Sequence, residues 1–115
     1  MKYTGLGKTG LHVSEIGFGA WAIGGQAWGN DVNDKNAVAA LQEAWQQGIN
    51  LFDTADCYGD GHSEALIGAF LLGQREKAVI VTKGGTNYRV KERSKDFTRD
   101  YLIRSLDESL ERLQT

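Results

Sequence analysis

Residues 49–55 read INLFDTA and residues 78–83 read AVIVTK. Both stretches are short and mostly apolar, and they are rich in the β-branched and aromatic residues that favour strands. A charged residue interrupts each one near its end, Asp53 in the first and Lys83 in the second. Near-continuous apolar runs are typical of parallel strands that are buried on both faces. The two stretches therefore predict neighbouring strands of a parallel sheet.

Amphipathic helices are predicted between and after these strands. The first spans residues 34–47 and stops at Gly48, and Ser63 is expected to cap the second, which ends near Gly73. Thr98 is expected to cap the third. The apolar residues at helical spacing are Val38, Leu41, Ala44 and Trp45 in the first helix, Leu66, Ile67, Phe70 and Leu71 in the second, and Leu102, Leu106, Leu110 and Leu113 on one face of the third.

The order of the elements predicts an α/β fold with a parallel sheet. Turn glycines predict a small hairpin over residues 1–14, EIGFGAW at 15–21 predicts the first strand, and residues 15–115 then supply three βα units. Three parallel strands alone leave both sheet edges unpaired. We therefore expect residues 1–115 to form the amino-terminal part of a larger domain, with another strand after Thr115.

Composition excludes several classes of function. The net charge is −2 with interspersed signs, and the most basic stretch, residues 83–95, reads as a polar loop with Lys91, Arg93 and Lys95 in solvent, so no nucleic acid partner is expected. No apolar run reaches the roughly 20 residues of a membrane helix, and the first residues lack a signal-peptide core. Cys57 is the only cysteine, which argues against a disulfide or thiolate metal site and suggests a cytoplasmic protein without a metal.

Polar side chains follow the ends of the predicted strands. Loops that leave the carboxyl ends of parallel strands share one face of the sheet, so Trp21, Asp53 and Lys83 should converge there. A carboxylate and an ammonium group buried at such a place are expected to form an ion pair, since each then offsets the desolvation of the other. An ion pair that serves only to hold the fold together is the alternative.

Tyr58 lies five residues after Asp53, in the loop above the same face. A nearby ammonium group stabilises a phenolate, so a tyrosine beside Lys83 is suited to donate a proton. A tyrosine that merely packs in the loop is the alternative. The combination of Asp53, Tyr58 and Lys83 favours a catalytic site.

Three segments together resemble the aldo-keto reductase superfamily. They are LGKTGLHVSEIGFGAW at 6–21, GINLFDTADCYGDGHSEALIG at 48–68 and VIVTKGG at 79–85, in the family's order and at its separations. The short loop that ends in G-x-G-x-S-E is similar to the bacterial and potassium-channel β-subunit branch. The resemblance extends over nearly the whole chain and implies a (β/α)8 TIM barrel, of which this chain supplies the hairpin and the first three βα units.

The resemblance also implies an activity, the NADP(H)-dependent reduction of aldehydes or ketones. Tyr58 would be the general acid, Lys83 would assist it, and Asp53 would hold Lys83 and touch the nicotinamide ribose. The backbone of Gly19, Ala20 and Trp21 would lie along the nicotinamide, and Trp21 and Tyr58 would line the substrate pocket. Core packing at the barrel mouth is the alternative for Trp21, and preference for NADP over NAD rests on the family alone.

The family's fourth catalytic residue is a histidine on the fourth strand, which is expected after Thr115. His12 and His62 lie elsewhere in the predicted fold and are expected at the surface. The 115-residue chain alone is therefore expected to be inactive and to need the remainder of the barrel, or a complementing chain, as its partner. Trp28, in the loop after the first strand, is a further candidate for the pocket wall or for a loop anchor.

The sequence has two alternative interpretations. Residues 17–22 fit the G-x-G-x-x-A dinucleotide fingerprint, but a dozen loop residues separate them from the next helix and Asp53 comes too late for the ribose acid of a Rossmann domain. A non-enzymatic, redox-responsive binding subunit of the channel β-subunit type is the functional alternative.

Overall fold

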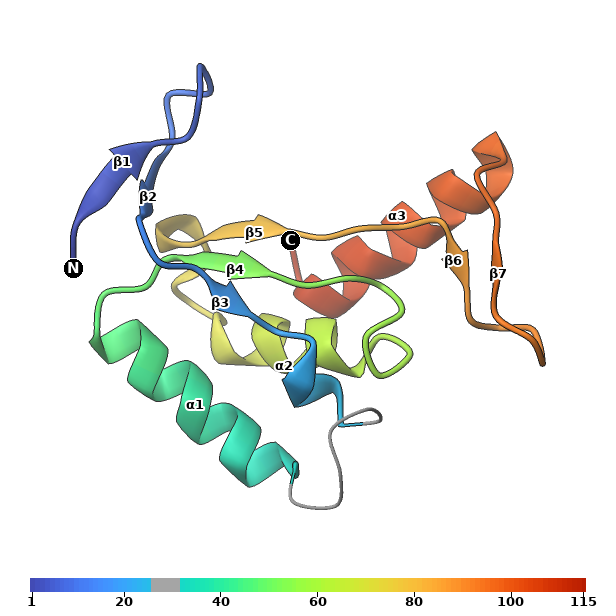
Figure 1. Ribbon diagram of the computed structural model, residues 1–115, viewed down its shortest axis with the longest axis horizontal. Coiled ribbons are helices and arrows are strands. Elements are labelled where there is room, and N and C mark those ends of the chain that lie inside the picture. Colours follow the sequence, from blue (N-terminus) through green and yellow to red (C-terminus); the bar gives the residue numbers. More distant parts are fainter. Residues whose placement is uncertain (26–31) are drawn as a thin grey trace.

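The computed structural model describes residues 1–25 and 32–115, so Trp28 lies outside the described residues. The chain starts with an antiparallel pair, β1 (Tyr3–Gly5) and β2 (His12–Ser14), in which Thr4 lies opposite Val13. Figure 1 shows this pair beside the start of the sheet. The predicted amino-terminal hairpin is confirmed.

A parallel sheet of three strands forms the centre of the molecule. Its strands are β3 (Phe18–Gly19), β4 (Leu51–Asp53) and β5 (Val79–Val81), in the order β3-β4-β5. In register, Asp53 lies between Gly19 and Val81. The parallel pairing is confirmed, although the strands are shorter than predicted. Backbone hydrogen bonding continues beyond β4, because the Thr54 N–H donates to the Val81 carbonyl at 2.8 Å.

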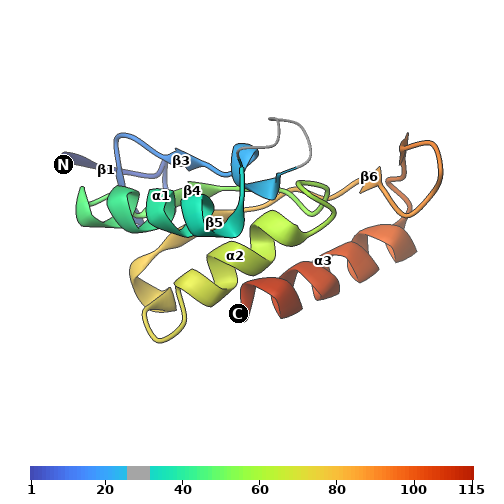
Figure 2. The ribbon, with the colours of Figure 1, turned by 90° about the horizontal axis from the view of Figure 1, so that it is seen from below.

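In the described part of the chain, three α-helices alternate with the strands: α1 (Asp34–Gln46), α2 (His62–Phe70) and α3 (Arg99–Leu113). Two short 3-10 helices, η1 (Ala22–Gly24) and η2 (Arg75–Lys77), join them. The side chain of Asn33 accepts a hydrogen bond from the Asn36 N–H and caps α1. Figure 2 shows α2 and α3 on the same side of the sheet. Within residues 1–25 and 32–115, no helix is long and apolar enough to cross a membrane.

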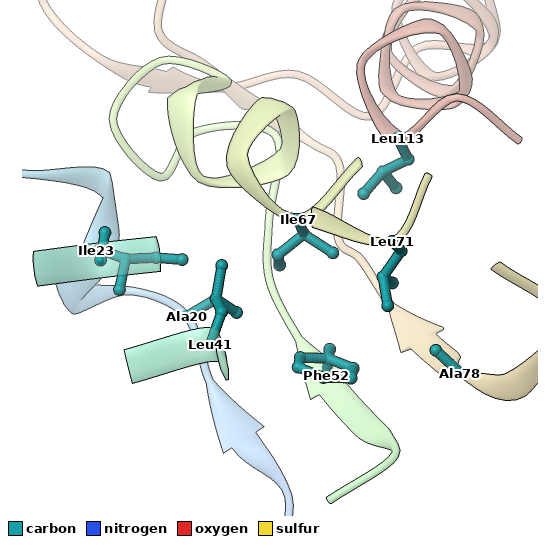
Figure 3. Packing of buried hydrophobic residues seen from close by; sticks show 9 residues of the cluster. Ala20, Ile23, Leu41, Phe52, Ile67, Leu71, Ala78 and Leu113 are labelled. Carbon is teal, nitrogen blue, oxygen red and sulfur yellow. The ribbon is translucent and has the colours of Figure 1, made fainter. Parts of the chain in front are cut away.

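The core lies between the sheet and the helices. Phe52 at the centre of β4 is fully buried, and the Trp45 ring of α1 stacks on it with centroids 6.2 Å apart. Figure 3 shows the side chains that meet from the strand ends and helices: Ala20, Ile23, Leu41, Phe52, Ile67, Leu71, Ala78 and Leu113. Residues of α1 and α2 pack with strand residues in this core, whereas α3 packs mainly on α2 and adds Leu113 to the cluster.

The start of α2 differs from the prediction. Gly61, with a left-handed backbone at φ 94°, occupies the capping position, and Ser63 lies within the first turn. The Ser63 hydroxyl is buried and donates to the Ala20 carbonyl at 2.8 Å, while it lies 3.0 Å from the Thr54 hydroxyl. The predicted capping role of Ser63 is therefore wrong, because this hydroxyl instead joins the ends of two strands to the helix.

The orientation of α3 also differs from its leucine pattern. Its buried residues are Ser105, Ser109 and Leu113, whereas Leu106 is 54% exposed. Gly68 of α2 explains the inversion, since an added Cβ there would collide with the Arg112 carbonyl. Small residues let α2 and α3 approach closely, and most of the leucine face remains open. Thr98 does occupy the capping position of α3, but its side chain makes no capping hydrogen bond.

The segment read as a polar loop contains a second hairpin. Strands β6 (Thr86–Asn87) and β7 (Ser94–Lys95) pair antiparallel, with Thr86 opposite Lys95. The Tyr101 hydroxyl of α3 donates to the Thr86 carbonyl at 2.8 Å, which fixes the base of the hairpin. The sequence pattern does not predict the β6–β7 hairpin, because its strands are only two residues long.

Candidate active site

Asp53 and Lys83 form an ion pair at the carboxyl ends of β4 and β5. The Lys83 Nζ donates to Asp53 Oδ1 at 2.7 Å and to the Thr54 carbonyl at 2.6 Å. The predicted pairing is confirmed. The predicted burial is wrong, however, since the side chains of Lys83 and Asp53 are 45% and 52% exposed. They lie on the face of the sheet opposite Phe52, which is not covered by the helices of residues 1–25 and 32–115.

Tyr58 joins this pair from the β4–α2 loop. The Lys83 Nζ lies over the Tyr58 ring, 5.2 Å from its centroid. An ammonium group has three hydrogens, and the Lys83 Nζ donates to Asp53 and to the Thr54 carbonyl, so one hydrogen remains to be donated. The Trp21 ring lies on Tyr58 with centroids 6.1 Å apart. The structure thus brings together the acid, phenol, amine and indole that the sequence placed at the strand ends.

The loop that carries Tyr58 is held tightly by its own backbone. The Tyr58 N–H donates to the Ala55 carbonyl, and the Tyr58 carbonyl accepts from the Ser63 N–H, both at 3.2 Å. Gly59 has φ 61° and lies so close to Gly24 that an added Cβ would collide with the Gly24 carbonyl. Only glycine fits there without strain, so the position of the phenol is set by backbone contacts.

Asp56 is a buried residue of the site that the sequence pattern does not single out. It is 1% exposed, its N–H donates to the Lys83 carbonyl at 3.0 Å, and its Oδ2 accepts from the Ser105 hydroxyl at 2.5 Å. Its other oxygen has no partner within the described part of the chain. Asp56 therefore ties the Tyr58 loop to β5 and α3. Burial, with a contribution from the Asp56 charge, also raises the pKa of the nearby Tyr101 phenol. The one feature of the sequence that could have pointed to Asp56 is its position between Asp53 and Tyr58.

A cavity of about 310 Å³ lies beside Tyr58 and Lys83. The β6–β7 hairpin forms one of its walls, and Arg93 of the hairpin pairs with Asp60 of the Tyr58 loop at 2.6 Å. The sequence predicts Arg93 as a solvated loop residue, but in the structure it forms an ion pair with Asp60. The lining residues are Ala55, Asp56, Cys57, Tyr58, Lys83, Gly84, Thr86 and Lys95.

The predicted nicotinamide contacts lie at the end of β3. Gly19 is exposed, and a Cβ added there would meet no heavy atom of the described residues within 4 Å. Ala20 is fully buried. Its N–H donates to the Asp53 carbonyl, and its carbonyl accepts from the Ser63 hydroxyl. Trp21 is 53% exposed. Gly19 and Trp21 are therefore accessible to a ligand, whereas Ala20 is already engaged within the fold.

The two histidines lie away from this site. His62 Nε2 lies 2.7 Å from Asp34 Oδ1 and joins the starts of α2 and α1. His12 is an exposed residue of β2. Over residues 1–25 and 32–115, no three histidine, cysteine or acidic side chains are grouped as a metal site would require.

Sequence comparisons identify the family. The family model for the aldo/keto reductase family matches residues 15–115. Aldo-keto reductase YhdN of Bacillus subtilis is 36% identical over all of this chain and 35% of its own length. L-galactose dehydrogenase of Arabidopsis thaliana is 44% identical over 95% of this chain and 33% of its length. A probable voltage-gated potassium channel subunit beta of Oryza sativa is 34% identical over 98% of this chain and 34% of its length.

Solved structures agree. The holo form of aldo-keto reductase AKR11C1 from Bacillus halodurans superposes with a TM-score of 0.87 at 33% identity, over all of this chain and 37% of that chain. An aldo-keto reductase from Klebsiella pneumoniae in complex with NADPH gives a TM-score of 0.69 at 29% identity, over 92% of this chain and 33% of that chain. This chain spans about a third of the length of its curated relatives and corresponds to the amino-terminal part of their (β/α)8 barrel. The chain belongs to the aldo/keto reductase family.

Proposed function

We propose that this chain forms the amino-terminal part of an NADP(H)-dependent enzyme that reduces aldehydes or ketones to alcohols. The family implies oxidoreductase chemistry on carbonyl compounds in general. The observation that carries the proposal for this chain is the position of Lys83, which bonds Asp53 at 2.7 Å and lies over the Tyr58 ring beside an open cavity.

The residues at the end of β3 fit a nicotinamide ring. Exposed Gly19 has open space around it, and half-exposed Trp21 offers a flat apolar face. We propose that Gly19, Ala20 and Trp21 line the nicotinamide, with Asp53 near its ribose. The bound nicotinamide supplies a hydride to the carbonyl carbon.

In this proposal Tyr58 donates its phenolic proton to the carbonyl oxygen, which completes the alcohol. The Lys83 ammonium stabilises the phenolate charge that develops on Tyr58, and the phenolate then regains a proton from solvent. Asp53 and the Thr54 carbonyl hold the Lys83 amine in place. Trp21 and Tyr58 form one wall of the substrate pocket.

The side chains of Asp53 and Lys83 are about half exposed on the open face of the sheet, so we propose that activity belongs to the longer protein. The 115-residue chain alone is expected to show no steady-state turnover, because the fourth catalytic residue and most cofactor contacts lie in the rest of the barrel. The partner of this chain is then the remainder of the barrel or a complementing chain, and its location is the cytoplasm.

A second candidate function is a redox-responsive binding subunit. The 34% identity to a protein named as a probable potassium channel subunit beta favours it. Retention of a channel cytoplasmic terminus on the immobilised protein, together with negligible turnover of carbonyl compounds, would support this alternative.

The test is NADPH oxidation by the full-length protein with aldehydes and ketones, compared between wild type and Lys83→Met. The loss of a positioned charge that assists proton transfer should lower kcat by about 100-fold or more. Lys91→Met, which removes an exposed charge from the β6–β7 hairpin, is the matched control. Full activity of Lys83→Met would show that the proton donor has been misidentified.

A further inference from the structure

Lys95 is a second cation in the cavity that contains Tyr58 and Lys83. The sequence predicts it as a loop residue in solvent. In the structure it belongs to β7, in the hairpin that lines one side of the cavity. The cavity beside the proposed proton donor is thus lined by two lysines.

The two ammonium groups differ in how their charge is balanced. Lys83 is paired with Asp53 at 2.7 Å, whereas Lys95 forms no ion pair with any residue that the structure describes. Asp56 also lines the cavity, but its carboxylate is buried and its Oδ2 is taken by Ser105. The solvent-exposed charge at the hairpin wall is therefore the positive charge of Lys95, whereas the negative charge of Asp56 is buried.

The immediate surroundings of Lys95 fit a carboxylate. The Lys95 Nζ donates to the Thr86 hydroxyl oxygen at 2.7 Å. An ammonium group carries three hydrogens, so two remain to be donated. The Thr86 hydroxyl accepts from Lys95 and so keeps its own hydrogen to donate. Two adjacent donors, one of them charged, match the two oxygens of a carboxylate.

The hairpin holds these donors in a defined place. Two hydrogen bonds fix its base. The Tyr101 hydroxyl donates to the Thr86 carbonyl, and the Asp96 N–H donates to the Gly85 carbonyl at 3.1 Å. Arg93 ties its other end to Asp60. The cavity wall that carries Lys95 is therefore anchored both to α3 and to the Tyr58 loop.

We propose that the enzyme prefers carbonyl substrates that carry a carboxylate, which Lys95 and Thr86 bind while the carbonyl group faces Tyr58. This inference rests on the proposed reductase function and adds the substrate class to it. A single ammonium balances a single negative charge, which favours a carboxylate over a phosphate dianion. Lys95 is a specificity residue in this arrangement, since it touches the substrate away from the reacting atoms.

The test compares two aldehydes of similar size, 4-carboxybenzaldehyde and 4-methylbenzaldehyde, with NADPH and the full-length protein. Wild type should favour the carboxylated aldehyde in kcat/KM. Lys95→Gln should lower the ratio of the two kcat/KM values by about tenfold, as expected when a charge-assisted hydrogen bond to the ligand is lost. Lys95→Arg should keep most of the preference, and Lys91→Gln, with the same change of net charge on the same hairpin, should keep all of it.

The outcomes separate the inference from the function. If wild type reduces both aldehydes and Lys95→Gln leaves their ratio unchanged, the inference is overturned and the reductase function stands. An equal drop in the ratio for Lys91→Gln would also overturn it, because the effect would then come from net charge alone. If wild type reduces neither of these aldehydes nor any other aldehyde or ketone, the proposed function fails as well.

Discussion

Phe52 and Asp53 are neighbours in the chain but lie on opposite faces of the β3-β4-β5 sheet. Phe52 is fully buried under the helices, whereas the Asp53 side chain is 52% exposed and pairs with Lys83. Successive side chains of a strand point to opposite faces. One strand therefore contributes to stability through one residue and to the candidate site through the next.

The covered face and the open face of the sheet also differ in how much of their surface is left for the rest of the barrel to cover. In a (β/α)8 barrel the face away from the helices becomes the packed interior, and the active site lies at the carboxyl ends of the strands. In this chain Val81 on that side is 40% exposed. Helices of this chain bury Phe52 on the covered face, whereas Asp53 and Lys83 lie on the open face.

The largest expected effect is on the open face. Tyr58→Phe in the full-length protein should lower kcat by about 100- to 10,000-fold, because the proton donor is lost. NADPH affinity, measured by titration of protein fluorescence, should change less than twofold. Tyr3→Phe removes a hydroxyl that bonds the Gly48 carbonyl far from the site and serves as the control. Loss of NADPH binding in Tyr58→Phe would mean that the phenol has a structural role.

The next effect is on the covered face. Phe52→Ala should lower the free energy of unfolding by about 3–5 kcal/mol, since it leaves a cavity in the core. Val81→Ala on the open face should cost less than about 1 kcal/mol, because that side chain already contacts solvent. Urea denaturation of the 115-residue chain measures both. Equal losses at the two positions would contradict the difference between the faces.

A buried ion pair behind the covered face gives a somewhat smaller effect. Glu64 is fully buried, accepts from the Thr82 hydroxyl at 2.5 Å and pairs with Arg112 at 2.7 Å. Glu64→Gln should cost about 3 kcal/mol, since it removes one partner of a buried pair. Glu111→Gln, on the exposed side of α3, should leave the unfolding midpoint nearly unchanged. A small loss in Glu64→Gln would show that solvent reaches Arg112 more freely than its 20% exposure indicates.

The smallest effect is expected on the open face of α3. Leu106→Ser should change the stability of the 115-residue chain by no more than about 0.5 kcal/mol, as is usual for an exposed position. The same substitution in the full-length protein should cost more if the remainder of the barrel covers this face. Thermal unfolding of both forms gives the comparison, and a loss above about 1 kcal/mol in the short chain would mean that Leu106 is already packed.

The sequence predicted the parallel sheet, the three helices and the convergence of Asp53, Tyr58 and Lys83. These features follow from local periodicity and from the rule that strand ends share a face, and both act over short stretches of chain. Asp53 and Lys83 are 30 residues apart in the sequence, yet the pairing of two adjacent strands in register is enough to bring them together.

Other features depend on how distant elements pack and were missed. Ser63 looked like a helix cap, but its hydroxyl bonds the Ala20 carbonyl, 43 residues away. The leucine face of α3 looked like the packing face, but Gly68 allows the closer approach of Ser105 and Ser109. No pattern along the chain distinguishes these outcomes, because the choice is made by the fit between two helices.

The central claim is that a carbonyl bound on the open face receives hydride from the nicotinamide while Tyr58 supplies the proton. NADPH carrying two deuterium atoms at nicotinamide C4, used with the full-length protein and benzaldehyde, tests it directly. The account predicts benzyl alcohol with one deuterium at the carbinol carbon for wild type, and at least 100-fold slower formation of that product for Tyr58→Phe. Unlabelled alcohol, or labelled alcohol formed by Tyr58→Phe at the wild-type rate, would contradict the account.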